Sequence, residues 1–95
     1  MVTEIWRLKS LCSLNWRRFG DEWVAYDEGS GDTYRMDTLS AVTLMCLAEA
    51  PGSLPDLTTQ VAIETDLPAG EELSQALASV LETYAGEGLI EPAAP

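Results

Sequence analysis

The sequence contains no histidine, and no lysine or arginine follows position 35. Without histidine, the chain has no Ser–His or Cys–His pair that could activate a nucleophile. The glycine-rich motifs GxxxxGK and GxGxxG, which cradle phosphates, are also missing. The sequence therefore offers little support for an enzyme, and we expect neither catalytic residues nor a cofactor.

Cysteine is scarce, because Cys12 and Cys46 are the only two and they form no CxxC pair. Zinc sites use closely spaced ligand pairs, and disulfides belong to oxidising compartments. We therefore interpret both cysteines as small, partly buried apolar residues rather than as a disulfide or a metal pair. Residues 27–32 offer the carboxylates of Asp27, Glu28 and Asp32 to a hard cation, but their spacing is not that of an EF-hand. We expect a solvated turn there and no metal.

Long apolar runs are absent too. No stretch approaches the roughly 18 apolar residues of a membrane span, and the first ten residues lack the pattern of a signal peptide. The length of 95 residues fits one domain. We expect a single cytoplasmic domain over residues 1–95 that does not bind membranes.

Positive charge is confined to the front of the chain, although the net charge is −11. The first 35 residues hold all five bases and six acids, whereas residues 36–95 hold ten acids and no base. Binding to a phosphate backbone or to membrane headgroups normally needs clustered lysines or arginines. The charge distribution therefore predicts that the protein does not bind nucleic acid.

The front of the chain has the patterns of β-strands. Residues 5–9 alternate apolar and polar side chains, and residues 14–19 are a second candidate. Residues 23–26 and 33–36 are rich in β-favouring side chains and flank the turn residues 27–32. These last two runs predict a hairpin within a three-stranded antiparallel sheet.

The faces of this hairpin are assigned from Arg35, because the alternation that turns Tyr34 and Met36 to the core places Arg35 outside. We expect Arg35 and Trp23 on the outer face, where Trp23 could form a cation–π pair or belong to a contact surface. The core-facing residues would then be Val24, Tyr26, Tyr34 and Met36. The other large aromatic residues are interpreted as core, namely Trp6, Trp16 and Tyr84.

Helical periodicity begins after position 37 and predicts three helices, over residues 38–49, 54–64 and 71–85. Asp37 and Ser53 have the side chains of N-caps, and Gly86 fits the C′ position of the third helix. Leu89 and Ile90 follow as a short apolar tail. Strands followed by a helix-turn-helix predict an α+β fold of the winged helix-turn-helix type, with an N-terminal three-stranded antiparallel sheet and a three-helix bundle.

Several motifs resemble one family. The pattern Trp6…Leu14-x-Trp16…Glu22-x-Val24-x-Tyr26 is followed by Ser30-Gly31-Asp32-Thr33, by Met36-Asp37 and by Leu81-x-x-Tyr84-x-x-Glu87-Gly88-Leu89-Ile90-Glu91-Pro92. Together they resemble PqqD-like proteins, in particular the PqqD-related peptide chaperone of the HPr-rel-A type. Two positions depart from that pattern, because Tyr34 stands where His is frequent and Arg35 stands where an apolar residue is usual.

The resemblance implies a recognition element for ribosomally made, modified peptides. Such domains bind the leader segment of a precursor peptide as an added strand, beside the third helix, and present it to a modifying enzyme without catalysis of their own. Its partners would be a precursor peptide and either a peptide-modifying enzyme or an HPr-kinase-related protein, with a homodimer left open. The expected peptide-binding residues are Thr33, Tyr34, Arg35, Met36, Leu73, Leu77 and Val80.

Two other functions remain as alternatives. One is a structural or oligomerisation module of a multiprotein complex, and the other is a winged-helix DNA-binding regulator, which the charge distribution disfavours. The sequence also leaves the charge of the peptide open. The acidic helices favour a basic peptide, while Arg35 could pair with a peptide acid.

Overall fold

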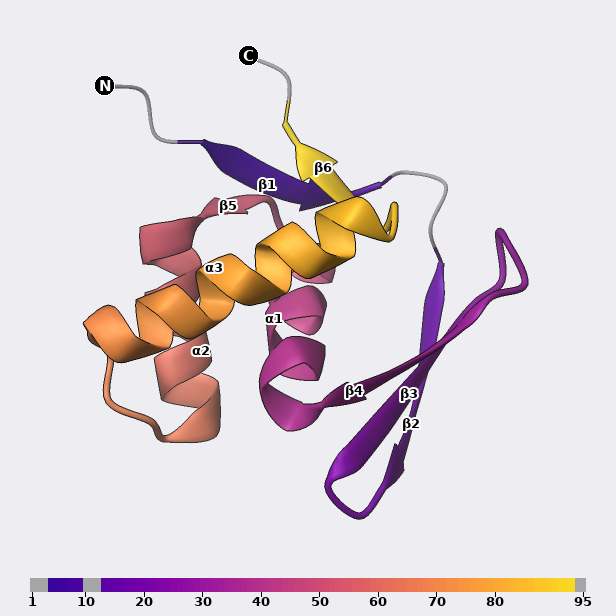
Figure 1. Cartoon of the computed structure of the whole chain (residues 1–95), viewed down its shortest axis with the longest axis horizontal. Helices are drawn as coiled ribbons and strands as arrows, with labels where there is room; N and C mark the ends of the chain where they lie inside the picture. The colour runs from indigo at the N-terminus through magenta and orange to yellow at the C-terminus, as the bar shows by residue number, and fades with distance from the viewer. Residues whose placement is uncertain (1–3, 10–12, 94–95) are drawn as a thin grey trace.

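The computed structural model describes residues 4–9 and 13–93 and has an α+β, winged-helix-like fold. One three-stranded antiparallel sheet, β5-β1-β6, lies across one end of three helices, and a second, β2-β3-β4, stands beside α1 (Figure 1). The elements are β1 (Ile5–Leu8), β2 (Leu14–Phe19), β3 (Glu22–Asp27), β4 (Thr33–Asp37), α1 (Thr38–Glu49), β5 (Gly52–Ser53), α2 (Leu54–Thr65), α3 (Glu71–Gly86) and β6 (Ile90–Pro92).

The helices begin where the sequence predicted, because their caps are local. The Asp37 carboxylate accepts a hydrogen bond from the Ser40 N–H at 2.9 Å. The Ser53 hydroxyl accepts one from the Asp56 N–H at 3.2 Å. Each cap satisfies a first-turn donor that has no partner inside its helix, which stabilises a helix by about 1 kcal/mol.

The end of α3 differs from the prediction. Gly86 is the last residue of the helix, and Gly88 has the left-handed φ of 84° instead. This turn directs Leu89 and Ile90 into the core, where each is 1% exposed. Ile90 also begins β6, so the predicted apolar tail is a strand.

Of the sheet β5-β1-β6, the sequence predicted only the central strand, β1. In β1, Ile5 pairs with Ser53 of β5 and Trp6 pairs with Pro92 of β6. Both partners are short strands that only these long-range pairings define. Residues 5–8 therefore do not extend the hairpin sheet, and instead they join the two ends of the described chain beside α2.

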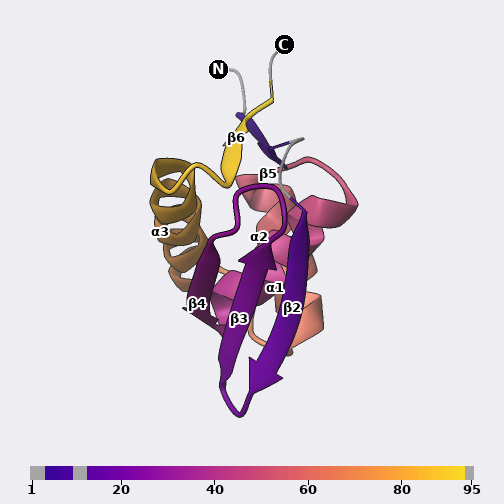
Figure 2. The ribbon, with the colours of Figure 1, turned by 90° about the vertical axis from the view of Figure 1, so that its right-hand side faces the viewer.

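The sheet β2-β3-β4 is an antiparallel meander whose inner face packs on α1 (Figure 2). The predicted inward orientation of Tyr34 and Met36 in β4 is confirmed. The predicted inward orientation of Val24 and Tyr26 in β3 is wrong, because both lie on the outer face. Ala25 is fully buried because its small side chain faces the helices at this point. The inner face of the hairpin is formed by Trp23, Ala25, Tyr34 and Met36.

Trp23 therefore faces inward, against the prediction. Its indole N–H donates to the Thr38 hydroxyl at 3.2 Å, and its ring meets the Trp16 ring edge-on. The cation over its ring is Arg18, at 5.4 Å from the centroid, and not Arg35. This cluster ties β2 and β3 to the start of α1.

The turn between β3 and β4 is organised by a buried carboxylate. Asp27 is 4% exposed and accepts hydrogen bonds from the Ser13 N–H, the Gly29 N–H and the Ser30 hydroxyl, each at 3.0 Å. These donors hold the carboxylate that was considered for a cation. Within the described residues, no group of three or more acidic, cysteine or histidine side chains is placed to hold a metal ion.

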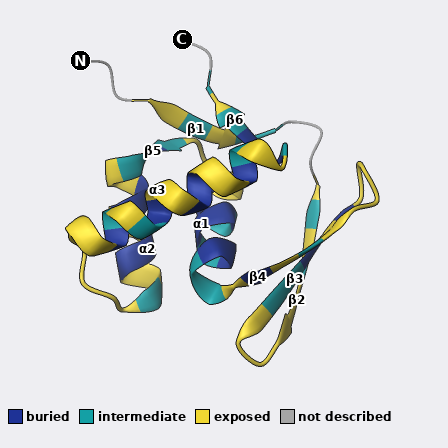
Figure 3. Ribbon diagram, in the orientation of Figure 1, coloured by how far each residue is buried: buried dark blue, intermediate teal, exposed yellow. Residues whose placement is uncertain are grey.

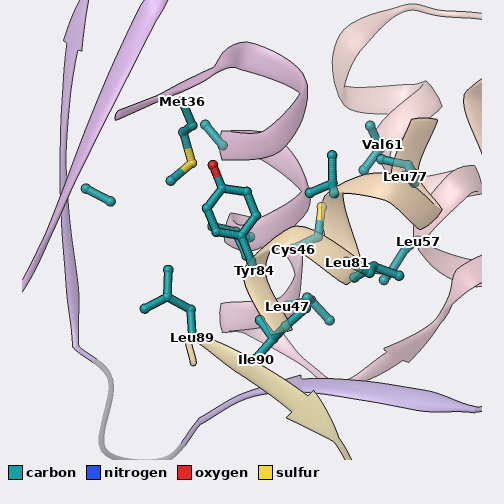
Figure 4. Packing of buried hydrophobic residues seen from close by; sticks show 14 of the residues in the cluster. Met36, Cys46, Leu47, Leu57, Val61, Leu77, Leu81, Tyr84, Leu89 and Ile90 are labelled. Carbon is teal, nitrogen blue, oxygen red and sulfur yellow. The ribbon is translucent and has the colours of Figure 1, made fainter. Parts of the chain in front are cut away.

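The core lies where the three helices meet (Figure 3). Leu77, Val61 and Tyr84 point into it, and Cys46 is buried there as a free thiol (Figure 4). Trp6 and Trp16 pack against its margin and are half-buried, while Cys12 lies outside the described residues. No helix within the described ranges is long and apolar enough to cross a membrane.

Candidate functional site

The outer edge of β4 is the first component of the site. The Asp27 N–H donates to the Asp32 carbonyl at 2.9 Å, which marks a hydrogen-bonded position in the β3–β4 ladder. Bonded and non-bonded pairs alternate in an antiparallel ladder. The bonded pairs that follow in this register are Ala25–Tyr34 and Trp23–Met36.

The backbone groups of Thr33, Arg35 and Asp37 consequently point away from β3. β4 is the last strand in the order β2-β3-β4, and among the described residues no strand pairs with its other side. Backbone donors and acceptors on such an edge can pair with an extended chain. The strand thus offers a template for an added strand.

Three clefts lie near this edge: the first borders the β2–β3 turn and the end of β4, and the other two border α3. The first, of about 570 Å³, lies at the end of β4 and includes Phe19, Arg35 and Asp37 in its lining. The second, of about 340 Å³, separates the start of α1 from α3 and also contains Asp37. Here we call the outer edge of β4 and the three clefts together the β4–α3 groove.

The third cleft lies at the turn between α2 and α3 and has a volume of about 430 Å³. It shares Leu39 and Ala76 with the second cleft, so the two adjoin each other. Its other apolar side chains are Leu67, Pro68 and Leu73. The groove therefore extends from the hairpin to the far end of α3.

The structure places the predicted site residues in three different environments. Thr33 and Arg35 are exposed on the outer face of the sheet, whereas Tyr34 and Met36 turn their side chains inward. Leu77 is 0% exposed and belongs to the core, so it does not line the groove.

Leu73 and Val80 lie at the bottom of the groove and are almost fully buried. Its accessible wall on α3 is formed by residues that the sequence analysis missed: Ala76, Ser79 and Thr83. They are small side chains beside the apolar stripe of the helix. Small residues at helical spacing next to a core stripe are the signal that could have identified this wall, because they leave room for another chain.

Negative charge dominates the groove. Five carboxylates contribute to the lining of its clefts, against one base, Arg35. The Arg35 guanidinium lies 3.5 Å from the Glu22 carboxylate, and both side chains are largely exposed. The five acids are Asp21, Glu22, Asp37, Glu71 and Glu72.

Tyr84 borders the second cleft, and its surroundings change the pKa of its hydroxyl. Burial raises the pKa of its hydroxyl, a hydrogen bond with Ser40 lowers it, and the charges of Asp37 and Glu87 raise it further. The net effect is an increase of the pKa, so the tyrosine stays neutral at neutral pH. Tyr84 thus presents a neutral hydroxyl beside the groove.

Comparison with known proteins agrees with this arrangement at the level of the fold. No protein-family model matches the chain, and no curated protein sequence matches it either. A solved structure described as TbiB1 in complex with the TbiA(beta) leader peptide is similar, with a TM-score of 0.64 and 15% sequence identity. The match covers 94% of this chain and 99% of that chain, so the two share their fold over nearly their full lengths.

Proposed function

We propose that this chain binds an extended peptide along the outer edge of β4 and presents it to a peptide-modifying enzyme. The peptide would add a fourth strand to the sheet β2-β3-β4, and its side chains would enter the β4–α3 groove. Main-chain hydrogen bonds supply affinity in this mode, and the pockets supply sequence preference. The chain itself performs no chemistry in this proposal.

The orientation of the Arg35 backbone carries the proposal. Its N–H and C=O face the open side of β4, and the first cleft that borders α3 begins at Asp37, two residues further along the chain. The structure with the same fold was solved with a leader peptide, which supports a peptide as the ligand here.

The nature of the downstream enzyme rests on the family resemblance alone. PqqD-like proteins act with a separate modifying enzyme, and the HPr-rel-A type is found beside an HPr-kinase-related protein. We therefore propose that a precursor peptide is the cargo and that one of these proteins receives it.

The test begins with peptides selected from a random display library on the immobilised full chain. Affinities of the best peptides would then be measured by calorimetric titration against wild type, Arg35→Pro and Arg35→Glu. Proline removes the outward N–H but is tolerated on an edge strand. Losing one hydrogen bond should weaken binding roughly tenfold, whereas the Glu variant should keep main-chain pairing.

A matched control lies on the opposite edge of the same sheet. The Glu28 N–H donates to the Ser13 carbonyl at 3.0 Å, so the alternating ladder directs the Arg18 backbone away from β3. Arg18→Pro removes the corresponding outward N–H on the β2 edge together with the Arg18–Trp23 contact, and a folded variant should keep the wild-type affinity. Failure to select any peptide, or equal weakening by both proline variants that remain folded, would contradict binding on β4.

A further inference from the structure

The third cleft of the groove combines an apolar floor with an acidic rim. Leu39, Leu67 and Leu73 contribute its aliphatic lining, and Leu67 is 46% exposed although it is a large apolar side chain. Glu71 and Glu72 stand at its rim in the first turn of α3. An apolar side chain flanked by a cation has the chemistry that complements this pocket.

The distance from β4 to this cleft suits a single extended peptide. From Thr83 to Glu71 the helix axis advances roughly 18 Å, at 1.5 Å per residue. An extended chain covers that distance in about five or six residues. Added to a segment paired with the five residues of β4, the groove would hold about ten residues in all.

The charges along this path are unequal. At the β4 end Arg35 lies beside three acids, Asp21, Glu22 and Asp37, whereas no base lies anywhere in residues 36–95. The N-terminus of α3 carries a partial positive charge of about half a unit, which Glu71 and Glu72 outweigh. The third cleft has two carboxylates and no base in its lining, so a cation of the peptide meets no like charge there.

We infer that the ligand is a peptide of asymmetric charge, and this inference rests on the proposed function. Its strand-forming part carries no basic residue opposite Arg35. About five residues away, a large apolar side chain occupies the cleft of Leu39, Leu67 and Leu73. One or two lysines or arginines next to that side chain contact Glu71 and Glu72.

The display selection described above tests the inference without assuming it. The selected peptides should share a large apolar residue adjacent to lysine or arginine, displaced from an uncharged extended segment. Peptides that lack this basic residue but are still weakened by Arg35→Pro would overturn the inference and leave the proposed function intact. If no peptide is selected, both fail.

Paired variants then locate the two contacts. Glu71→Gln/Glu72→Gln should weaken the selected peptide roughly threefold to tenfold in low salt, as expected for two exposed ion pairs, and less at 0.5 M NaCl. Glu49→Gln/Glu64→Gln changes the net charge equally on other exposed surfaces. Equal effects of the two pairs would overturn the contact at α3.

The apolar contact has its own control. Leu67→Ala should weaken the same peptide, whereas Ile63→Ala should not, because Ile63 is 74% exposed on α2 and does not line the groove. Melting curves of all variants would confirm that each is folded. Equal affinities of the Leu67 and Ile63 variants would remove the third cleft from the binding path.

Discussion

Leu77 provides the sharpest test of the helix arrangement. Its side chain is 0% exposed and points into the core that α3 shares with α1 and α2 (Figure 4). Truncation of a buried leucine to alanine costs about 2–5 kcal/mol, because transfer energy is lost and a cavity is left. A protein of 95 residues has a total stability of about 5–14 kcal/mol. Leu77→Ala should therefore remain largely folded but melt at least about 8 °C lower, at roughly 4–8 °C per kcal/mol.

Leu77→Asp adds to this loss the cost of burying a carboxylate. No arginine or lysine follows position 35 in the sequence, so the helices around it supply no cation to pair with the new charge. An unpaired buried charge costs several kcal/mol more, which should unfold most of the protein at 25 °C. The assay is circular dichroism with urea titration. Ala78→Asp, at the exposed neighbouring position, should fold normally, and a wild-type melting curve for Leu77→Asp would refute the placement of α3.

Two further outcomes can be measured on the wild-type fold. Gel shifts at physiological salt should show no duplex DNA binding, because residues 36–95 include both helices of the helix-turn-helix and contain no base; a tight, salt-sensitive shift would contradict this. The pKa of Tyr84 is raised in the folded protein, so its hydroxyl contributes fully to stability below about pH 10. Above that pH the hydroxyl ionises first in the unfolded chain, and this contribution to stability is lost. Urea unfolding from pH 8 to 11 should show a shallower alkaline decline in Tyr84→Phe than in wild type, while Tyr26→Phe, at an exposed ring, should follow wild type.

Local signals explain which parts of the fold could be predicted. The helix starts at Thr38 and Leu54 follow from the side chains just before them, Asp37 and Ser53, which need no information from distant residues. By contrast, β5 and β6 have two and three residues and form only against β1. Their pairing depends on the folded positions of the chain ends, which no short-range pattern contains.

The face of β3 shows a different limit. Trp23, Val24, Ala25 and Tyr26 all suit a strand, so alternation alone leaves two registers of similar quality. The close approach of α1 selects the register that buries Ala25, a tertiary effect.

The same limit applies to the candidate site. A helical stripe such as Leu73, Leu77 and Val80 identifies the side that is buried, and a binding groove lies at the margin of that side. β4 itself was predicted from local sequence, but its assignment as the strand of the site came from the family resemblance and from the free edge of a terminal strand. The margin of α3 could not be assigned without knowing which neighbours cover the rest of the helix.

The charge at the edge of β4 affects whether two copies of the chain can pair along this edge. Exposed strand edges tend to pair with one another, and charged side chains are a common protection. If two copies paired antiparallel about Arg35, the two guanidinium groups would face each other, which is destabilising. The net charge of −11 would oppose association of two copies further.

A peptide with its cations away from Arg35 avoids both the repulsion between two guanidinium groups and the repulsion between two acidic chains. Its uncharged strand segment can pair with β4, and its basic end is attracted by the carboxylates at the start of α3. The charges that disfavour pairing between two copies therefore also favour a ligand of the opposite sign. Raising the salt concentration should weaken this ligand and, by screening the repulsion, make self-association of the chain easier.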